Sequence, residues 1–483
     1  MNSPKTSVQT SAPVAAIRSV LPTDANERVS SMLERAGELE REAETLEAEI
    51  AAACDWSDYG VKITRYSVLA DADQKELREG ARAKFPAAAD LRARVLAELP
   101  KASGARLASR LDAALEEAVW SLVDLSRPTS SQRSIAGLIR GKRTLRELSS
   151  QEIKKLGETR FLELASDELR SVTDLAVWEI LGPALGRVGS LDLPRHDLHS
   201  ITDPAIWKFL APALGQLNYL NLSECRLGEI TDLAVWASLA PALGRVKFLD
   251  LSGANLASIT DPAIWKLLAP ALGQVRTLDI SRALLGSIAD PAIWKLLAPA
   301  LCRVRGLDLS SNDLHLITDP AIWNLIAPAL GQVRYLNLSS NRLPPAVLGL
   351  LAPALGTVRC LDLVEIDLGF ADLAVWELLA PALGRVGCLN LYNTKLNSIT
   401  DPAVWKLLAP ALGRVRHLGL AKIKFGSITD PAIWKILAPE LLKVPSLDLR
   451  GTCLHQLDPA IWAPLSARKH DSYFCYRPDS VLA

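Results

Sequence analysis

The feature that most constrains this chain is a 29-residue segment that recurs in tandem. Residues 259–287 read ITDPAIWKLLAPALGQVRTLDISRALLGS, and the following copy begins IADPAIWKLLAPALCRVRGLDLSSN. The first half of each copy is nearly constant, whereas the second half changes. A residue that packs against its own copy in the next unit must suit that copy. The constant half is therefore predicted to be the packed side of a stack.

Tryptophans mark the extent of the array, and they are spaced by 29 residues until a shortened unit interrupts them at about 342–370. They are Trp178, Trp207, Trp236, Trp265, Trp294, Trp323, Trp376, Trp405, Trp434 and Trp462. Identical contacts repeated in every copy predict buried core rather than an aromatic binding strip. The array is predicted to span residues 143–465, with atypical copies at both ends that cover the core.

Within a typical unit, Asp203 followed by Pro204 predicts a helix start, because the carboxylate caps the helix and proline needs no N–H donor there. Pro212 predicts a break, since it removes one hydrogen bond and its ring meets a carbonyl four residues earlier. Gly215 is expected to end the helix in a left-handed conformation. The alternating residues 217–222 predict a short strand.

The second half of the unit resembles a known signature. Residues 333–343 read Val-x-x-Leu-x-Leu-x-x-Asn-x-Leu, which is similar to the leucine-rich repeat, and the helix with its 28–29-residue period resembles the ribonuclease-inhibitor type. The resemblance implies an α/β solenoid, with a parallel sheet on its concave face and helices on its convex face. In the family, the Asn or Cys of this signature bonds backbone groups in the turn. Only Cys225, Asn312 and Asn341 fit that role here.

The remainder of the chain has a different character. Residues 1–22 are rich in Ser, Thr, Pro and Ala and are predicted to be a disordered leader. Residues 23–142 are predicted to be all-α, and apolar residues at three- and four-residue steps within 29–50 form a coiled-coil-like seam. This seam indicates either a small bundle that packs on itself or dimerisation through residues 29–50. Residues 466–483 are predicted to be a C-terminal cap or tail.

Outward-facing strand positions predict the functional surface. Counting Val333 as position one, positions two, three, five, seven and eight are expected to face the hollow of the solenoid and to be free of packing constraints. They hold a basic row (Arg276, Arg305, Arg334), an acidic row (Asp250, Asp279, Asp308) and rings expected to be exposed (Tyr219, Phe248, Tyr335). Aromatic and arginine side chains among polar neighbours are typical of protein-binding surfaces. The alternative is that the two charged rows only solvate and pair with one another.

Composition and motifs exclude several classes. The balance of 54 basic and 54 acidic residues argues against a nucleic-acid binder, and no apolar run reaches the ~18 residues of a membrane span. Seven scattered cysteines and an N-terminus without a secretory signal suit a reducing, cytoplasmic location. The phosphate-binding, dinucleotide, metalloprotease and hydrolase motifs are missing, so we expect neither catalytic residues nor cofactors.

Three further side chains could carry chemistry. Cys360, Cys388 and His417 occupy position three of consecutive strands, so they are expected in a row with ~5 Å between neighbours. Such a set could bind zinc or be oxidised, but a flat row rarely gives tetrahedral geometry. The next residue in line is Ser446 rather than a fourth ligand. The row is therefore interpreted as two adjacent free thiols without a metal.

These observations favour a non-catalytic scaffold that binds another protein through the concave face of the repeats. The alternative is a translocated effector or a ubiquitin-ligase-type protein, whose N-terminal helical region acts on the partner that the repeats capture. The sequence identifies no residue that would perform the second role.

Overall fold

A computed structural model describes residues 31–46, 71–115 and 149–465, apart from 33, 44, 101–102, 109–110, 113–114, 158–160, 165–168, 170–171, 458–460 and 462–463. The predicted leader 1–22 and tail 466–483 lie outside these residues. The chain divides into two compact units, one of residues 1–55 with 70–124 and the other of residues 56–69 with 125–483.

The described residues of the first unit are helical. Its helices are residues 31–46, α4 (Asp71–Lys84), α5 (Pro86–Glu98) and the described part of 103–115. The first of these helices lies beside α5, because Arg35 Nε is 2.7 Å from Glu98 Oε2 and Glu42 pairs with Arg94. Leu39, a residue of the predicted seam, is fully buried. The first helix therefore packs against its own unit, and dimerisation through residues 29–50 remains a prediction.

The second unit begins with α8 (Ser150–Leu156) and β1 (Phe161–Glu163) and continues as regular repeats. The strands are β2 (Ser190–Asp192), β3 (Tyr219–Asn221), β4 (Phe248–Asp250), β5 (Thr277–Asp279), β6 (Gly306–Asp308), β7 (Tyr335–Asn337), β8 (Cys360–Asp362), β9 (Cys388–Asn390), β10 (His417–Gly419) and β11 (Ser446–Asp448). The helices are α9 (Leu175–Leu185), α10 (Pro204–Leu214), α11 (Leu233–Leu243), α12 (Pro262–Leu272), α13 (Pro291–Leu301), α14 (Pro320–Leu330), α15 (Pro345–Leu355), α16 (Leu373–Leu383), α17 (Pro402–Leu412) and α18 (Pro431–Leu441). Among the described residues, no helix is both long and apolar enough to cross a membrane.

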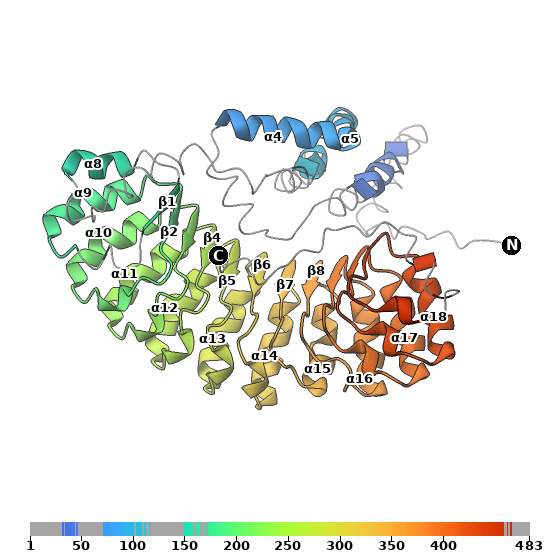
Figure 1. Cartoon of the computed structure of the whole chain (residues 1–483). Coiled ribbons are helices and arrows are strands. Elements are labelled where there is room, and N and C mark those ends of the chain that lie inside the picture. Colours follow the sequence, from blue (N-terminus) through green and yellow to red (C-terminus); the bar gives the residue numbers. More distant parts are fainter. Residues whose placement is uncertain are drawn as a thin grey trace, which may run out of the picture. The chain divides into compact units, whose positions relative to one another are not determined.

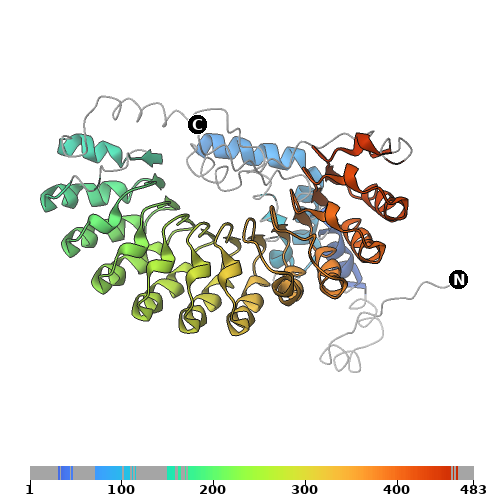
Figure 2. The same cartoon turned by 60° about the horizontal axis from the view of Figure 1, so that its bottom comes forward.

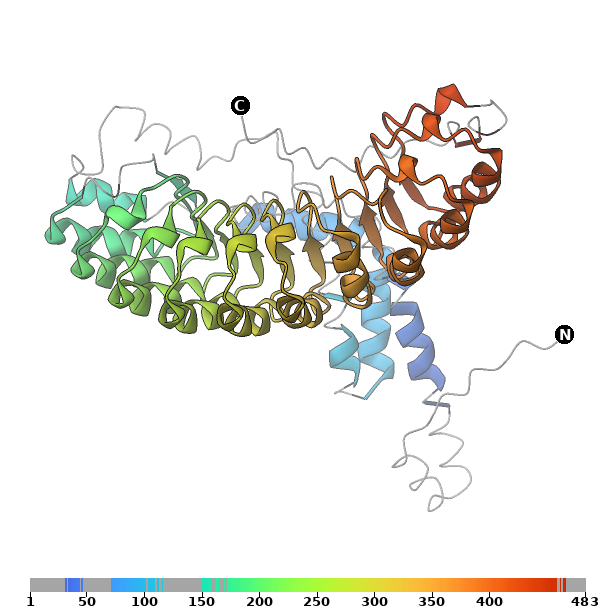
Figure 3. The same cartoon turned by 90° about the horizontal axis from the view of Figure 1, so that it is seen from below.

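The strands form one parallel sheet of 11 strands in sequence order, and equivalent residues of successive repeats lie opposite one another. This confirms the predicted leucine-rich-repeat solenoid. Within the repeat array, the strands line the inner side of an arc and the helices the outer side (Figures 1 and 2). Figure 3 shows the helices of successive repeats side by side. The array bends because paired strands lie ~4.8 Å apart, whereas packed helices need ~8–10 Å.

The segment Ile-Thr-Asp-Pro-Ala-Ile-Trp, or a close variant of it, encodes the start of most repeat helices. In α12, Asp261 Oδ1 accepts a hydrogen bond of 2.7 Å from the Ala263 N–H, as predicted for a capping aspartate. The indole N–H of Trp265 donates to the Ile259 carbonyl at 2.8 Å. This bond ties the helix to the segment that precedes it. The same two bonds recur in most repeats.

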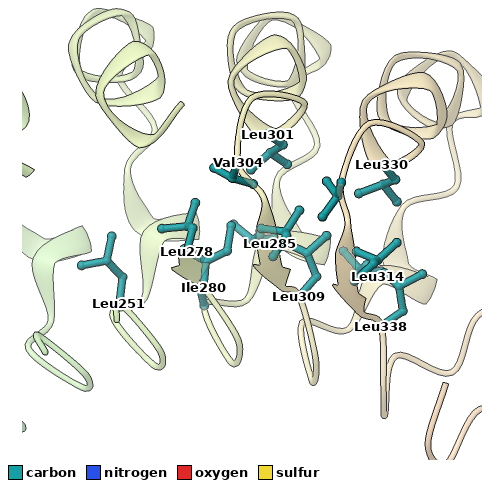
Figure 4. Close-up of a cluster of buried hydrophobic side chains, with 14 of the residues drawn as sticks. Leu251, Leu278, Ile280, Leu285, Leu301, Val304, Leu309, Leu314, Leu330 and Leu338 are labelled. Atoms are coloured by element: carbon teal, nitrogen blue, oxygen red, sulfur yellow. The ribbon is translucent and has the colours of Figure 1, made fainter. Parts of the chain in front are cut away.

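The core lies between sheet and helices. Leucine, isoleucine and valine side chains of successive repeats pack against one another there, as Figure 4 shows for Leu278, Leu309 and Leu338. The nine described tryptophans, from Trp178 to Trp434, are at most 2% exposed. The prediction that the indoles are core is confirmed for these nine, and Trp462 lies outside the described residues.

Two local predictions are wrong. Pro212 does not break its helix, since α10 runs from Pro204 to Leu214 without interruption. Pro212 and Lys208 are both exposed, so water can solvate the carbonyl that loses its N–H partner. Gly215 is right-handed, with φ −70° and ψ −5°. A Cβ at this glycine would lie 3.2 Å from Ala242 Cα, so its small size serves the close approach of the next repeat.

The left-handed residues lie after the strands instead. Position eight has a positive φ in every regular repeat: Arg195, Glu224, Gly253, Arg282, Ser311, Ser340, Glu365, Asn393, Lys422 and Gly451. Position nine supports this turn where the family residue is present. Asn312 accepts hydrogen bonds from the N–H groups of Ala283 and Leu285, and its amide donates to the Ile280 carbonyl. Other repeats keep the same turn with Ala, Ile or Thr at position nine, so the turn does not depend on asparagine.

Two repeats depart from the pattern at the helix start. In α15, Pro344 stands at the N-cap without a side-chain hydrogen bond, and Leu348 replaces the tryptophan. The loop before α16 is one residue shorter than its equivalents, which places Phe370 six residues before Trp376. Phe370 is 77% exposed, whereas the isoleucines that precede the other helices are buried. The buried indole N–H of Trp376 has no hydrogen-bond partner. In this repeat, the shortened loop therefore removes the hydrogen bond between the indole N–H and the preceding carbonyl group.

This difference predicts unequal costs for one substitution at two sites. Trp294→Phe leaves the Ile288 carbonyl without its 3.0 Å partner, whereas Trp376→Phe removes a group that bonds to nothing. Both variants lose similar packing volume. Trp294→Phe should therefore lower the free energy of unfolding by roughly 1–3 kcal/mol more than Trp376→Phe, measured by chemical denaturation. Equal losses would show that the indole hydrogen bond contributes little.

Candidate protein-binding surface

The predicted basic row is contiguous. The backbone N–H of Arg276 donates to the Lys247 carbonyl, that of Arg305 to Arg276, and that of Arg334 to Arg305, at 2.8–2.9 Å. The three arginines therefore follow one another in adjacent repeats, with Lys247 before them. Arg305 and Arg334 are exposed, and Arg276 is half-buried.

The predicted acidic row is contiguous as well. Asp250, Asp279 and Asp308 lie opposite one another in β4, β5 and β6. Each is half-buried, and each also has a structural role. Asp279 Oδ1 accepts a 2.9 Å hydrogen bond from the Ser281 N–H, and its two neighbours make the equivalent bond. The expectation that outward strand positions carry no structural constraint is therefore wrong for position five, which ends the strand by capping the turn.

Elsewhere along position five of the strands, asparagines lie between the aspartates. Asn337 Nδ2 donates to Asp308 Oδ2 at 2.8 Å, and Asn390 Nδ2 donates to Asp362 Oδ2 at 3.1 Å. No asparagine stands between Asp250, Asp279 and Asp308. Burial, followed by the charge of Asp308, raises the pKa of Asp279 well above its ordinary value. Three carboxyl groups therefore lie next to one another on β4, β5 and β6, with no asparagine between them.

One cation near this row was missed by the sequence analysis. Arg282, at the left-handed position eight, lowers the pKa of Asp250 and Asp308, against the larger effect of burial, which raises it. Its side chain is exposed. Position eight is one of the positions expected to face the hollow, but the sequence alone does not show that this turn residue lies near the acidic row. Arg282 belongs with the candidate surface.

The rings occupy position three, but they do not form one row. Tyr219 lies opposite Phe248, and then Thr277 and Gly306 intervene before Tyr335. The two tyrosines are half-buried. Phe248 is only 8% exposed, so the prediction of an exposed ring is wrong at this position. Neighbouring side chains on the concave side of an arc converge, and they cover it.

The three rows thus meet on β4 to β7. Small residues at Thr277 and Gly306 lie between the rings of Phe248 and Tyr335. A basic residue precedes each of these four strands, and an aspartate ends β4, β5 and β6, whereas Asn337 ends β7. A partner segment could place apolar atoms over the small residues and charged groups on either side. The nine predicted residues are thereby brought into one region of the concave face, with Tyr219 at its edge.

No protein-family model and no curated protein matches the sequence. Among solved structures, the crystal structure of the leucine-rich repeat-containing protein LegL7 from Legionella pneumophila is similar, with 22% sequence identity and a TM-score of 0.44. The similarity covers 63% of this chain and 95% of that one.

Because no asparagine separates Asp250, Asp279 and Asp308, we expect Asp279→Asn to raise the free energy of unfolding by an amount that depends on pH. The amide would keep the cap on Ser281 and could donate to a neighbouring carboxylate, as Asn337 does to Asp308. A carboxyl group whose folded pKa is raised contributes stability that is fully present below about pH 4 and lost as pH rises through the folded pKa. The variant should therefore exceed the parent in stability at pH 7.5, by roughly 1–2 kcal/mol.

Thermal or chemical unfolding from pH 4 to pH 7.5 measures this gain, which should shrink as the pH falls. Asp203→Asn makes the same chemical change at an exposed helix cap and is the matched control. A variant less stable than the parent at pH 7.5 would contradict the claim that adjacent carboxyl groups in the acidic row destabilise the fold.

Proposed function

We propose that the repeat array is a non-catalytic cytoplasmic scaffold that binds a protein partner through its concave face. The binding surface consists of Arg276, Arg305, Arg334, Asp250, Asp279, Asp308, Tyr219, Phe248 and Tyr335. The observation that carries the proposal is the convergence of the basic, acidic and aromatic rows on β4 to β7.

The chemistry of the surface suits a protein better than a small molecule or a nucleic acid. Opposite charges lie in parallel rows, so a partner with a complementary pair of rows would be steered into one register. Half-buried tyrosines at the margin and arginines with large contact areas are the side chains that dominate binding energy in protein interfaces. A nucleic acid would meet the acidic row and be repelled.

The acidic row is expected to lower stability at neutral pH, because burial raises the pKa of Asp279 well above its ordinary value, and such a cost supports a role in recognition. Asparagine at Asp279 would restore the spacing seen at Asn337 and Asn390, yet the carboxylate is present. Groups that weaken a fold are commonly retained where they act on a partner. A basic side chain of the partner would neutralise these carboxyl groups on binding.

The arrangement does not favour catalysis. The carboxylates of Asp250, Asp279 and Asp308 form a ladder on one face rather than a pair across a substrate, so general acid–base chemistry has no evident geometry. The effector or ligase alternative would place activity in the helical region 23–142, which belongs mainly to the other compact unit.

Charge reversal of the basic row should abolish partner binding without unfolding the protein. In the triple variant Arg276→Glu, Arg305→Glu, Arg334→Glu, affinity capture from a native lysate should lose the partner that the parent chain retains. Thermal unfolding should change by only a few degrees, because exposed and half-exposed charges contribute little to stability.

The matched control reverses three exposed lysines on the outer helices, Lys208, Lys266 and Lys295. It makes the same change in net charge on the opposite side of the array, and capture should persist. Capture that survives the arginine reversal would place the binding site elsewhere. Capture lost equally in both variants would indicate an effect of net charge alone.

A further inference from the structure

Two cysteines lie opposite one another on adjacent strands, beside Tyr335 of the proposed binding surface. Cys360 begins β8 and Cys388 begins β9, and the two residues are opposite one another in the parallel register. Neighbouring strands place such residues ~4.8 Å apart, within the 4.4–6.8 Å Cα separation that disulfides require. The strand pairing therefore holds the two cysteine side chains next to one another.

The electrostatic surroundings favour a thiolate at this pair. The thiols are hydrogen-bonded to one another, and this bond is the main cause that lowers the pKa of Cys388 below its ordinary value, against the opposing effect of burial. The charges of Arg359 and Arg416 lower it further. By contrast, burial raises the pKa of Cys225, which lies in the core, to about 12.

The pair also has limited access to solvent. Cys360 is half-buried and Cys388 is 9% exposed. The residue before Cys388 is Gly387, which adds no side chain, and a Cβ placed there would have only Arg359 atoms within 4 Å. A small molecule such as a peroxide can therefore approach where a large reagent would be hindered.

A metal fits the row less well. Tyr335 flanks Cys360 on one side, and His417 flanks Cys388 on the other, followed by Ser446. In the described part of the chain, no group of three or more His, Cys, Asp or Glu side chains could hold a metal ion. Two thiolates and one imidazole in a flat row lack the tetrahedral arrangement that zinc needs.

We propose that Cys360 and Cys388 form a modification site, at which a hydroperoxide oxidises the two thiols to a reversible disulfide. The Cys388 thiolate attacks one peroxide oxygen, the O–O bond breaks, and the leaving oxygen takes up the proton released from Cys388. The Cys360 sulfur then loses its proton and attacks the resulting sulfenic acid. The S–O bond breaks, and hydroxide leaves with that proton as water. Two electrons pass from the sulfurs to the peroxide.

The test uses the full chain treated with a small molar excess of hydrogen peroxide at pH 7.5. After remaining thiols are blocked with N-ethylmaleimide, trypsin separates the two cysteines into peptides 360–385 and 386–395. Mass spectrometry should find these peptides joined, and dithiothreitol should release them. Peptides that stay separate under conditions that oxidise Cys302 or Cys453 would overturn the proposal.

Two further readouts distinguish this site from chance oxidation. In a mixture of isotopically labelled and unlabelled protein, the disulfide should join peptides of the same molecule. Peptide pairs that mix the two labels would count against a preformed site.

Arg416→Gln should slow disulfide formation severalfold, because it removes a positive charge that stabilises the thiolate. Arg414→Gln, an exposed arginine two residues away, is the matched control and should leave the rate unchanged. An equal rate in both variants and the parent would overturn the role of the thiolate. The outcome does not depend on whether the concave face binds a partner.

Discussion

The packing of each repeat against its own copy is the constraint on which the rest of this structure depends. One unit offers about eight apolar residues, each contributing ~1.5–3 kcal/mol when buried, against an ordering cost of ~1–2 kcal/mol for every residue. A single unit therefore cannot fold alone. Between two copies both of its faces are covered, as the fully buried indoles from Trp178 to Trp434 show. The near-constant helical half follows from this requirement.

The same constraint creates the candidate surface. Strands in register turn every outward position into a row, so a residue type that recurs in the sequence becomes a continuous stripe on the sheet. Asp250, Asp279 and Asp308 show that such a stripe serves two purposes, because each carboxylate caps a turn while it faces the hollow. Cys360 and Cys388 show a different consequence, since register alone places two thiols side by side.

The sequence predicted the repeat, the capping aspartates and the buried tryptophans, because each of these depends on spacing or on local chemistry. It failed where the deciding partner lies in another repeat. Gly215 is small because Ala242 of the next unit approaches it, and Pro212 is accommodated because its side of the helix faces water. Phe248 is covered by neighbours on the concave face, and the pKa of Asp279 depends on Asp308 in the adjacent strand. The residue pattern of a single repeat does not show which side chains of the neighbouring repeats will contact it.

The central claim is that each repeat is stabilised only by contacts with the repeats on either side of it. Deletion of one whole 29-residue repeat tests this claim most directly. Deleting residues 262–290 joins Asp261 to Pro291 and restores the repeat in register. The shortened chain should keep native helix content and unfold cooperatively, within several degrees of the parent, by circular dichroism. Deleting residues 262–275 instead removes α12 but leaves β5, and it should abolish the cooperative transition. If the whole-period deletion also failed to fold, stacking between neighbours would not be what holds this protein together.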